Sequence, residues 1–191
     1  MTTDWGANAM NRRNLLTGLP GAALLPLAAG TALAQPPTPN APLTAIGADE
    51  YKSRTLMAGT LAKQTSELAL QKATNPKVKQ FANLEVMEQT AMAQVLTLQA
   101  SPPPARLDEK HAAALRELQS ASGAEFDKAY VKAQVEGHAE LLTIQDAYTI
   151  GRGQDTAAML ADDTARIATL AKAAIQTHLT MLKELTEVLR G

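Results

Sequence analysis

The chain has 191 residues, enough for one domain with a sizeable core, and it contains no cysteine. Its apolar share is 46%, rich in Ala and Leu, whereas aromatic residues make up only 3%. Ala and Leu favour helices and aromatic residues favour strands, so the composition predicts an all-α fold. The net charge is −1 with scattered Lys and Arg, which argues against a nucleic-acid partner. Without cysteine there are no disulfides, thiolate metal sites or cysteine nucleophiles.

The N-terminal segment has the pattern of an export signal. Arg12 and Arg13 precede a moderately apolar stretch over residues 14–29, and a small-residue cleavage motif ends at Ala34. The paired arginines resemble a twin-arginine signal, and a general secretory signal is the alternative. We therefore expect a signal peptide over residues 1–34 and a mature protein that is periplasmic or secreted.

Prolines dominate the segment after the expected cleavage site. Four of them fall within residues 35–47, which suits a semi-rigid extended tether. The helical domain is then expected over residues 48–191. Pro and Gly interrupt the apolar stretch of the signal, and no later segment is apolar enough to span a bilayer, so we expect no stable membrane span in the mature chain.

The first two long helices are expected over residues 48–74 and 76–100. Asn75 is a good N-cap and Pro76 suits the first position of a helix, so the two helices are separated by a tight turn and run antiparallel. Ser101 and the three prolines after it end the second helix.

Three further helical segments are expected over residues 108–120, 124–150 and 156–189. The first is a short helix within a long connection, with His111 on its surface, and the turn around Arg152 separates the other two. Four long helices with one long connection predict a ferritin-like four-helix bundle, with a crossover connection that carries a short extra helix. A cytokine-like bundle is the alternative arrangement.

Polar residues fall on the stripes that helical spacing predicts to be buried. The stripe of the second helix comprises Phe81, Leu84, Glu88, Ala91, Val95 and Leu98. In an antiparallel hairpin Gln64 and Glu88 have nearly the same height, and a crossover brings His138 to that layer. Together with His178 on the last helix, Glu88 and His138 are therefore the candidate metal ligands.

Spacing alone does not establish one shared site. If the turn is centred on Arg152, His138 faces Arg166, which is about 18 Å from His178 at a rise of about 1.5 Å per residue. Both histidines reach one ion only if the last helix begins late, kinks or shifts. Di-metal bundles also use Glu-x-x-His motifs, and this chain has none. Two interpretations of His138 and His178 therefore stay open: hydrogen-bonded histidines between the packed helices, or ligands of iron, manganese or zinc.

Two runs of the sequence resemble the bacterial family catalogued as domain of unknown function 4142. They are ELALQKATNPKVKQFA at residues 67–82 and FDKAYVKAQVEGH at residues 126–138, and His178 with the following leucine resembles the family's C-terminal motif. The resemblance spans about residues 48–188 and implies a ferritin-like bundle in the periplasm or envelope, without an established activity. Family members usually carry an Asp-His pair where this chain has Glu88 and Gln89.

Two functions follow from these observations. The first is an exported bundle with a non-catalytic role, through helix-face interactions or envelope stress tolerance, with no cofactor. The alternative is a transition-metal-binding bundle with storage or redox chemistry through His138, Glu88 and, if the last helix is shifted, His178. The sequence specifies no partner, and a homodimer is compatible with it.

Overall fold

The computed structural model describes residues 43–152 and 156–191, and all regular secondary structure in these residues is helical. The expected signal peptide and most of the expected tether lie outside the described residues. The prediction of an all-α bundle is confirmed. None of the described helices is long and apolar enough to cross a membrane. The helices are α1 (Ala48–Lys72), α2 (Pro76–Thr97), α3 (Glu109–Ser120), α4 (Gly123–Ile150), α5 (Thr156–Ala161) and α6 (Asp163–Arg190).

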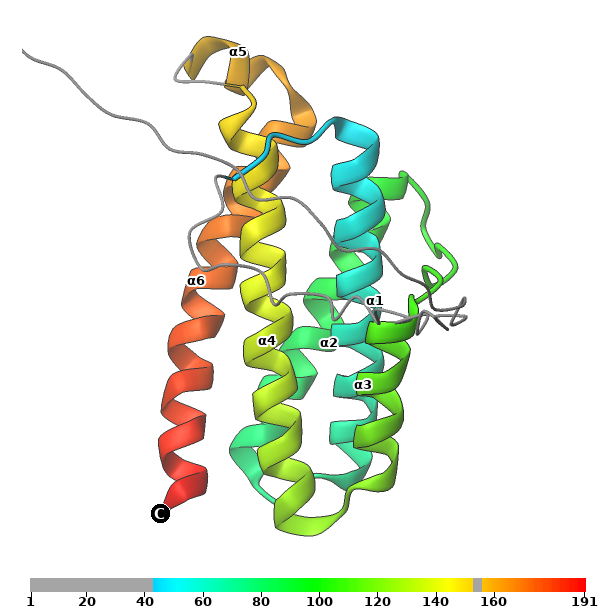
Figure 1. The fold of residues 1–191 in the computed structure, drawn as a ribbon, viewed down its shortest axis with the longest axis vertical. Helices are drawn as coiled ribbons and strands as arrows, with labels where there is room; N and C mark the ends of the chain where they lie inside the picture. Colours follow the sequence, from blue (N-terminus) through cyan, green and yellow to red (C-terminus); the bar gives the residue numbers. More distant parts are fainter. Residues whose placement is uncertain (1–42, 153–155) are drawn as a thin grey trace, which may run out of the picture. The chain divides into compact units, whose positions relative to one another are not determined.

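The long connection between α2 and α4 returns along the bundle, so α2 and α4 run in the same direction (Figure 1). Ala105 in this connection donates its backbone N–H to Thr60 Oγ1 on α1 at 3.0 Å. Farther along, Lys72 at the end of α1 donates to the carbonyl of Gln119 at 2.7 Å. The connection therefore follows α1 from its middle to its C-terminal end, and α3 packs against α1 and α4.

The start of α4 is fixed to the turn between α1 and α2. Asn75 caps α2 as predicted, because its side chain accepts from the backbone N–H of Lys77 at 2.9 Å. The buried carboxylate of Asp127 on α4 accepts from the backbone N–H groups of Thr74 at 3.0 Å and Asn75 at 2.9 Å, and from the Thr74 hydroxyl at 2.5 Å. These bonds set the height of α4 against α1 and α2.

The buried face of α2 differs in phase from the predicted stripe. On α2, Val95 is 49% exposed and Leu98 is 91% exposed, the latter in a left-handed conformation that ends the helix. The buried face of α2 instead comprises Val78, Phe81, Ala82, Glu85 and Leu96. On α1 small residues are buried, among them Ala58, Gly59, Ala62 and Ser66. The predicted buried stripe followed the large apolar side chains. The helices instead approach one another closely and bury small residues.

The last helical segment is interrupted, which changes the height of His178. A short α5 precedes α6, and Asp162 between them caps α6 by accepting from Thr164 N–H at 2.9 Å and Ala165 N–H at 3.1 Å. His138 lies 12 residues before the end of α4, and His178 lies 15 residues after the start of α6. At a rise of about 1.5 Å per residue the two differ in height by only about one helical turn. The last long helix thus begins late, which is the condition for a shared site.

The prediction that His111 lies on the surface is wrong. Its side chain is buried between α3 and α4, where Nδ1 is 2.6 Å from Asp108 Oδ1 and Nε2 is 3.2 Å from Glu140 Oε1. Because α3 packs against α4, the imidazole has a carboxylate on each ring nitrogen. His111 therefore joins the crossover connection to the bundle.

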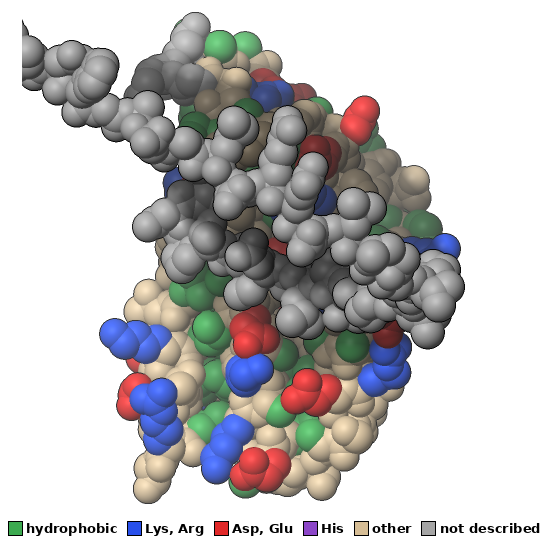
Figure 2. Space-filling view, viewed as in Figure 1, with side chains coloured by type: hydrophobic (Ala, Val, Ile, Leu, Met, Phe, Trp, Pro, Cys, Tyr) green, Lys and Arg blue, Asp and Glu red, His purple; other side chains and the backbone are tan. Residues whose placement is uncertain are grey.

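Charged side chains of both signs are interspersed on the face shown in Figure 2, over the lower parts of α4 and α6. Exposed charges of the described helices also form pairs within one helix, such as Lys132 with Glu136 at 3.0 Å and Arg190 with Glu187 at 2.7 Å. Such exposed pairs contribute little stability each. The described part of this face therefore has no stripe of one sign.

Candidate functional site

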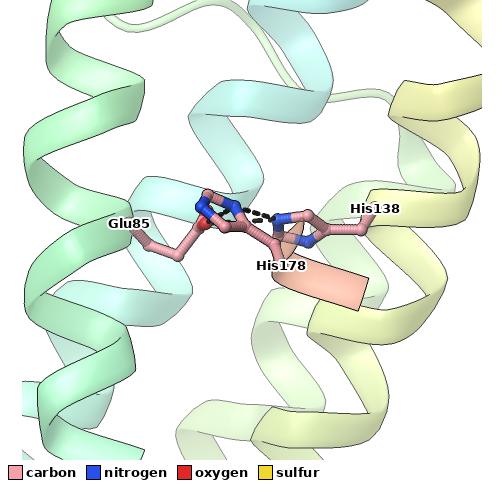
Figure 3. A group of neighbouring side chains, drawn as sticks. All are labelled: Glu85, His138 and His178. Atoms are coloured by element: carbon pink, nitrogen blue, oxygen red, sulfur yellow. Dashed lines mark hydrogen bonds and ion pairs between the residues drawn. The ribbon is translucent and has the colours of Figure 1, made fainter. Parts of the chain in front are cut away.

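Three side chains from three helices meet in the interior of the bundle (Figure 3). Glu85 comes from α2, His138 from α4 and His178 from α6, and their exposed fractions are 0%, 0% and 4%. Buried ionisable groups of this kind are costly unless they are paired or bind a cation. Among the described residues, this is the group of histidine and carboxylate side chains whose ligand atoms converge closely enough to hold one ion.

The outer nitrogen of each imidazole faces a hydrogen-bond acceptor. His138 Nδ1 lies 2.8 Å from the backbone carbonyl of Gln134, one turn earlier on α4. A carbonyl only accepts, so Nδ1 carries a proton and, in the neutral ring, Nε2 carries the lone pair. His178 Nε2 lies 3.1 Å from Glu88 Oε2, which leaves the lone pair of the neutral ring on Nδ1. Both inner nitrogens are therefore electron-pair donors.

These two nitrogens and one carboxylate oxygen form a nearly equilateral triangle. His138 Nε2 is 3.1 Å from His178 Nδ1 and 3.1 Å from Glu85 Oε1, and His178 Nδ1 is 2.9 Å from the same oxygen. With both histidines neutral, three lone pairs face one another without a proton between them. The arrangement is stable only with a proton or a metal cation at the centre.

The pKa shifts of Glu85 and His178 favour a proton in the metal-free cluster. Burial alone would raise the pKa of Glu85, but hydrogen bonds and charge from His138 and His178 outweigh it and lower the pKa from 4.5 to about 2. For His178, burial would lower the pKa, and the carboxylates of Glu85 and Glu88 outweigh burial and raise it above 6.5. Without a metal, an ionised Glu85 therefore favours a protonated His178 beside it.

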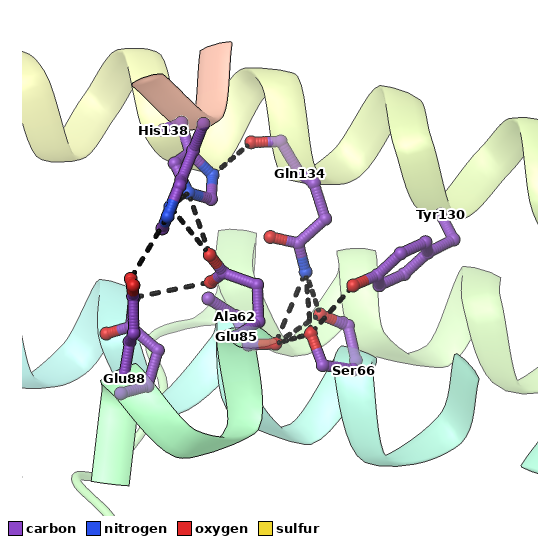
Figure 4. A network of polar contacts seen from close by, with 10 residues as sticks. Ala62, Ser66, Glu85, Glu88, Tyr130, Gln134 and His138 are labelled. Carbon is purple, nitrogen blue, oxygen red and sulfur yellow. Dashed lines mark hydrogen bonds and ion pairs between the residues drawn. The ribbon is translucent and has the colours of Figure 1, made fainter. Parts of the chain in front are cut away.

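A second set of buried polar residues joins the part of α4 that carries His138 to α1 (Figure 4). The buried Gln134 amide donates toward α1, to the Ala62 carbonyl at 3.3 Å, Thr65 Oγ1 at 3.0 Å and Ser66 Oγ at 3.2 Å. Ser66 Oγ is also 2.8 Å from the hydroxyl of Tyr130. The small residues of α1 allow this close approach, and the bonds fix the turn of α4 whose carbonyl orients the His138 ring.

The structure brings together two of the three predicted ligands and replaces the third. His138 and His178 are in contact, whereas Glu88 lies on the outer side of His178 and does not reach the centre of the triangle. Gln64 does not join the cluster and lines a surface groove instead. Glu85 takes the central place.

Sequence reasoning passed over Glu85 because the stripe of α2 was continued from Phe81 through Leu84 and Glu88. Continuing it from Phe81 by one turn of four residues leads to Glu85, on the same face of the helix. The second oxygen of Glu85 is fixed as well, since Gln89, one turn later, donates to Oε2 at 3.3 Å.

The fold and the site define an all-α bundle with a buried cluster of two histidines and one carboxylate. The family model described as "Domain of unknown function (DUF4142)" matches residues 33–185. The chain therefore belongs to this family, as the resemblance implied. No curated protein and no solved structure matches the chain, so the ferritin-like assignment of the bundle stays a prediction.

Proposed function

We propose that the protein is an exported bundle that binds one transition-metal ion through Glu85, His138 and His178. The single observation that carries this proposal is the convergence of three electron-pair donors from three helices in a buried layer. Iron(II) is the best candidate, and manganese and zinc are competitors. Export is supported by the N-terminal pattern of paired arginines, apolar stretch and cleavage motif.

The donor set supports this choice of metal. The three distances between the donor atoms are 2.9, 3.1 and 3.1 Å, so all three atoms are close enough to bind one ion. Two histidines and one carboxylate are the ligand set of non-haem iron(II) sites.

The groups around the ligands support metal binding too. A histidine ligand usually donates its other ring N–H to a carbonyl or carboxylate, which fixes the ring and its tautomer. Here the Gln134 carbonyl accepts from the His138 ring, and the Glu88 carboxylate accepts from the His178 ring. Glu88 is thus assigned to orienting a ligand. Bound iron would supply redox chemistry at its open positions, while the protein holds the three donors and excludes bulk water.

The test is a metal titration of purified mature protein stripped with chelator. Cobalt(II) is titrated first, because it serves as a spectroscopic probe. Iron(II), under anaerobic conditions, and zinc are then titrated in the same way. We expect one ion per chain in the wild type and none in Glu85→Gln or His138→Ala. His111→Asn, which changes a buried histidine outside the triangle, is the matched control and should keep full binding.

Absence of metal binding would favour the other function that the sequence left open, a non-catalytic role. Wild-type protein that binds no metal at micromolar concentrations, and keeps its unfolding midpoint in chelator, would mean that the cluster is a proton-linked ion pair. The bundle would then have the non-catalytic role, since Glu85 already has both histidines as partners.

A further inference from the structure

One side of α2 carries apolar residues that no described helix covers. Glu88 marks the direction of α6, because its Oε2 lies 3.1 Å from His178 Nε2. Ala91, Val95 and Leu98 follow Glu88 at intervals of three or four residues, so they lie on the same side of α2. Val95 is 49% exposed, Leu98 is 91% exposed, and Ala91 is exposed as well. This side of α2 is therefore apolar and open to solvent.

The adjoining side of α6 continues this surface. Ala174 lines a small cavity together with Glu88 and Met92, so it faces α2. Leu170 lies one turn before Ala174 and Thr177 lies three residues after it, on the same side of α6. Both are exposed, Leu170 by 73%. We name the joint surface the α2–α6 face, and it comprises Ala91, Val95, Leu98, Leu170, Ala174 and Thr177.

The α2–α6 face lacks charged side chains. Residues 89–105 include no Lys, Arg, Asp or Glu. Residues 167–182 include one, Lys172, and its Nζ lies 2.5 Å from Asp146 Oδ1 on α4. Glu88, at the edge of the face, is paired with His178. The solvent-facing sides of helices ordinarily carry charged residues, whereas the centres of protein interfaces are depleted of them. The composition of the face therefore indicates that another molecule covers it.

We propose that a second copy of this chain covers the α2–α6 face and forms a two-fold symmetric dimer. Each side chain near a two-fold axis meets its own copy, so a charge there would face a like charge. A face without charges avoids this repulsion, whereas a partner of another sequence would not require it to be neutral. A lipid surface fits less well, because helices that bind membranes carry Lys and Arg beside their apolar side.

The dimensions of the face are sufficient for a dimer of moderate affinity. At about 1.5 Å per residue, the 22 residues of α2 extend about 33 Å, and two adjacent helices are about 20 Å wide. This side of the two helices therefore offers roughly 650 Å² to a partner, close to the roughly 800 Å² per partner of a standard interface. We expect the dimer to dissociate in the micromolar range.

The large exposed side chains lie together on the face. The two helices run antiparallel (Figure 1). Val95 lies seven residues after Glu88, and Leu170 lies eight residues before His178, so the contact between Glu88 and His178 places Val95 and Leu170 at nearly the same height. A change at either residue therefore tests the same part of the interface.

Sedimentation velocity of the mature protein in excess chelator measures the dimer directly. The protein is loaded at concentrations from the low to the high micromolar range. We expect a reversible shift from a species with the mass of one chain to a species with the mass of two.

Two variants place a carboxylate on the face, Val95→Glu and Leu170→Glu. Both positions are exposed in a single chain, so the monomer accommodates the charge, whereas the dimer brings two new like charges into one interface. Each variant should raise the dissociation constant at least about tenfold. Leu70→Glu is the matched control, because Leu70 is 37% exposed on α1, outside the face, and its replacement should leave the dimer unchanged.

Wild-type protein that stays monomeric at every concentration would overturn the proposal. A dimer that both variants leave intact would do the same, since another surface would then form it. Flotation with vesicles of phosphatidylglycerol and phosphatidylethanolamine tests the lipid alternative: binding by monomeric wild type that Val95→Glu abolishes would assign the face to a membrane instead.

Circular dichroism establishes that each variant is folded, and either variant is decisive if the other is not. Because the metal is removed throughout, the outcome is independent of the metal titration.

Discussion

Gly59 makes room for the side chain that supports the central carboxylate. A Cβ atom at this position would lie 2.6 Å from Oε1 of Gln89. The same Gln89 donates to Oε2 of the buried Glu85 at 3.3 Å. Gly59→Ala therefore has to displace the Gln89 amide and weaken its bond to Glu85. By contrast, a Cβ at Gly137, within α4, has no atom within 4 Å.

The two glycines form a matched pair whose effects differ in sign. Gly137→Ala gains the helix propensity of alanine, about 0.5–1 kcal/mol. Gly59→Ala has the same gain but weakens a hydrogen bond to a charged group, worth about 1.5–3 kcal/mol. We expect Gly137→Ala to stabilise by about 0.5–1 kcal/mol and Gly59→Ala to destabilise by about 0.5–2 kcal/mol. At about 2–4 °C per kcal/mol for a domain of this size, the two Tm values differ by several degrees.

Urea unfolding of metal-free protein, followed by circular dichroism, measures both free energies. The double variant Gly59→Ala with Gln89→Ala isolates the cause, since alanine at 89 removes the amide that Cβ would meet. In that background Gly59→Ala should be stabilising, like Gly137→Ala. If Gly59→Ala destabilises equally with and without Gln89, the reasoning is refuted, because the penalty then comes from another contact.

Three further predictions concern other buried groups. Asp127→Asn should lower the free energy of unfolding by about 2–3 kcal/mol, because its carboxylate accepts from two backbone N–H groups of the turn after α1; a loss below about 0.5 kcal/mol in urea would contradict this role. Glu88→Gln should weaken cobalt(II) binding about 10–100-fold without abolishing it, since Glu88 orients His178 from outside the ligand set; complete loss in the same titration would make Glu88 a ligand. Burial raises the pKa of Tyr51 from 10.0 to about 12 and raises that of Tyr130 further. The unfolded chain therefore ionises first, stability falls as the pH rises above 10, and phenolate absorbance should appear together with the loss of helical circular dichroism; phenolate formation in fully helical protein would argue against burial of these rings.

Local signals in the sequence were sufficient for the helices themselves. Asn75 and Pro76 placed the first turn correctly because N-capping and the fixed backbone of proline are properties of neighbouring residues. The Ala- and Leu-rich composition determined the helical class, and the motifs around residues 67–82 and 126–138 determined the family.

The cluster itself depended on tertiary structure. His138 and His178 were identified from helical spacing, but their meeting required the break at Asp162 that makes α6 start late. Glu85 was missed because helical spacing allows the stripe of α2 to continue from Phe81 to Leu84 or to Glu85, and which of the two is buried depends on the packing of α2 against its neighbours.

The sequence by itself thus determined the class of fold, the order of the helices, the family and two of the three converging side chains. Only the tertiary structure decided the third, and with it the roles of Glu88 and Gln89 around the triangle. The physical reason is that capping and propensity act between near neighbours in the chain. Which face of a helix is buried depends on how closely its partner helices approach, and that is set by contacts between residues far apart in sequence.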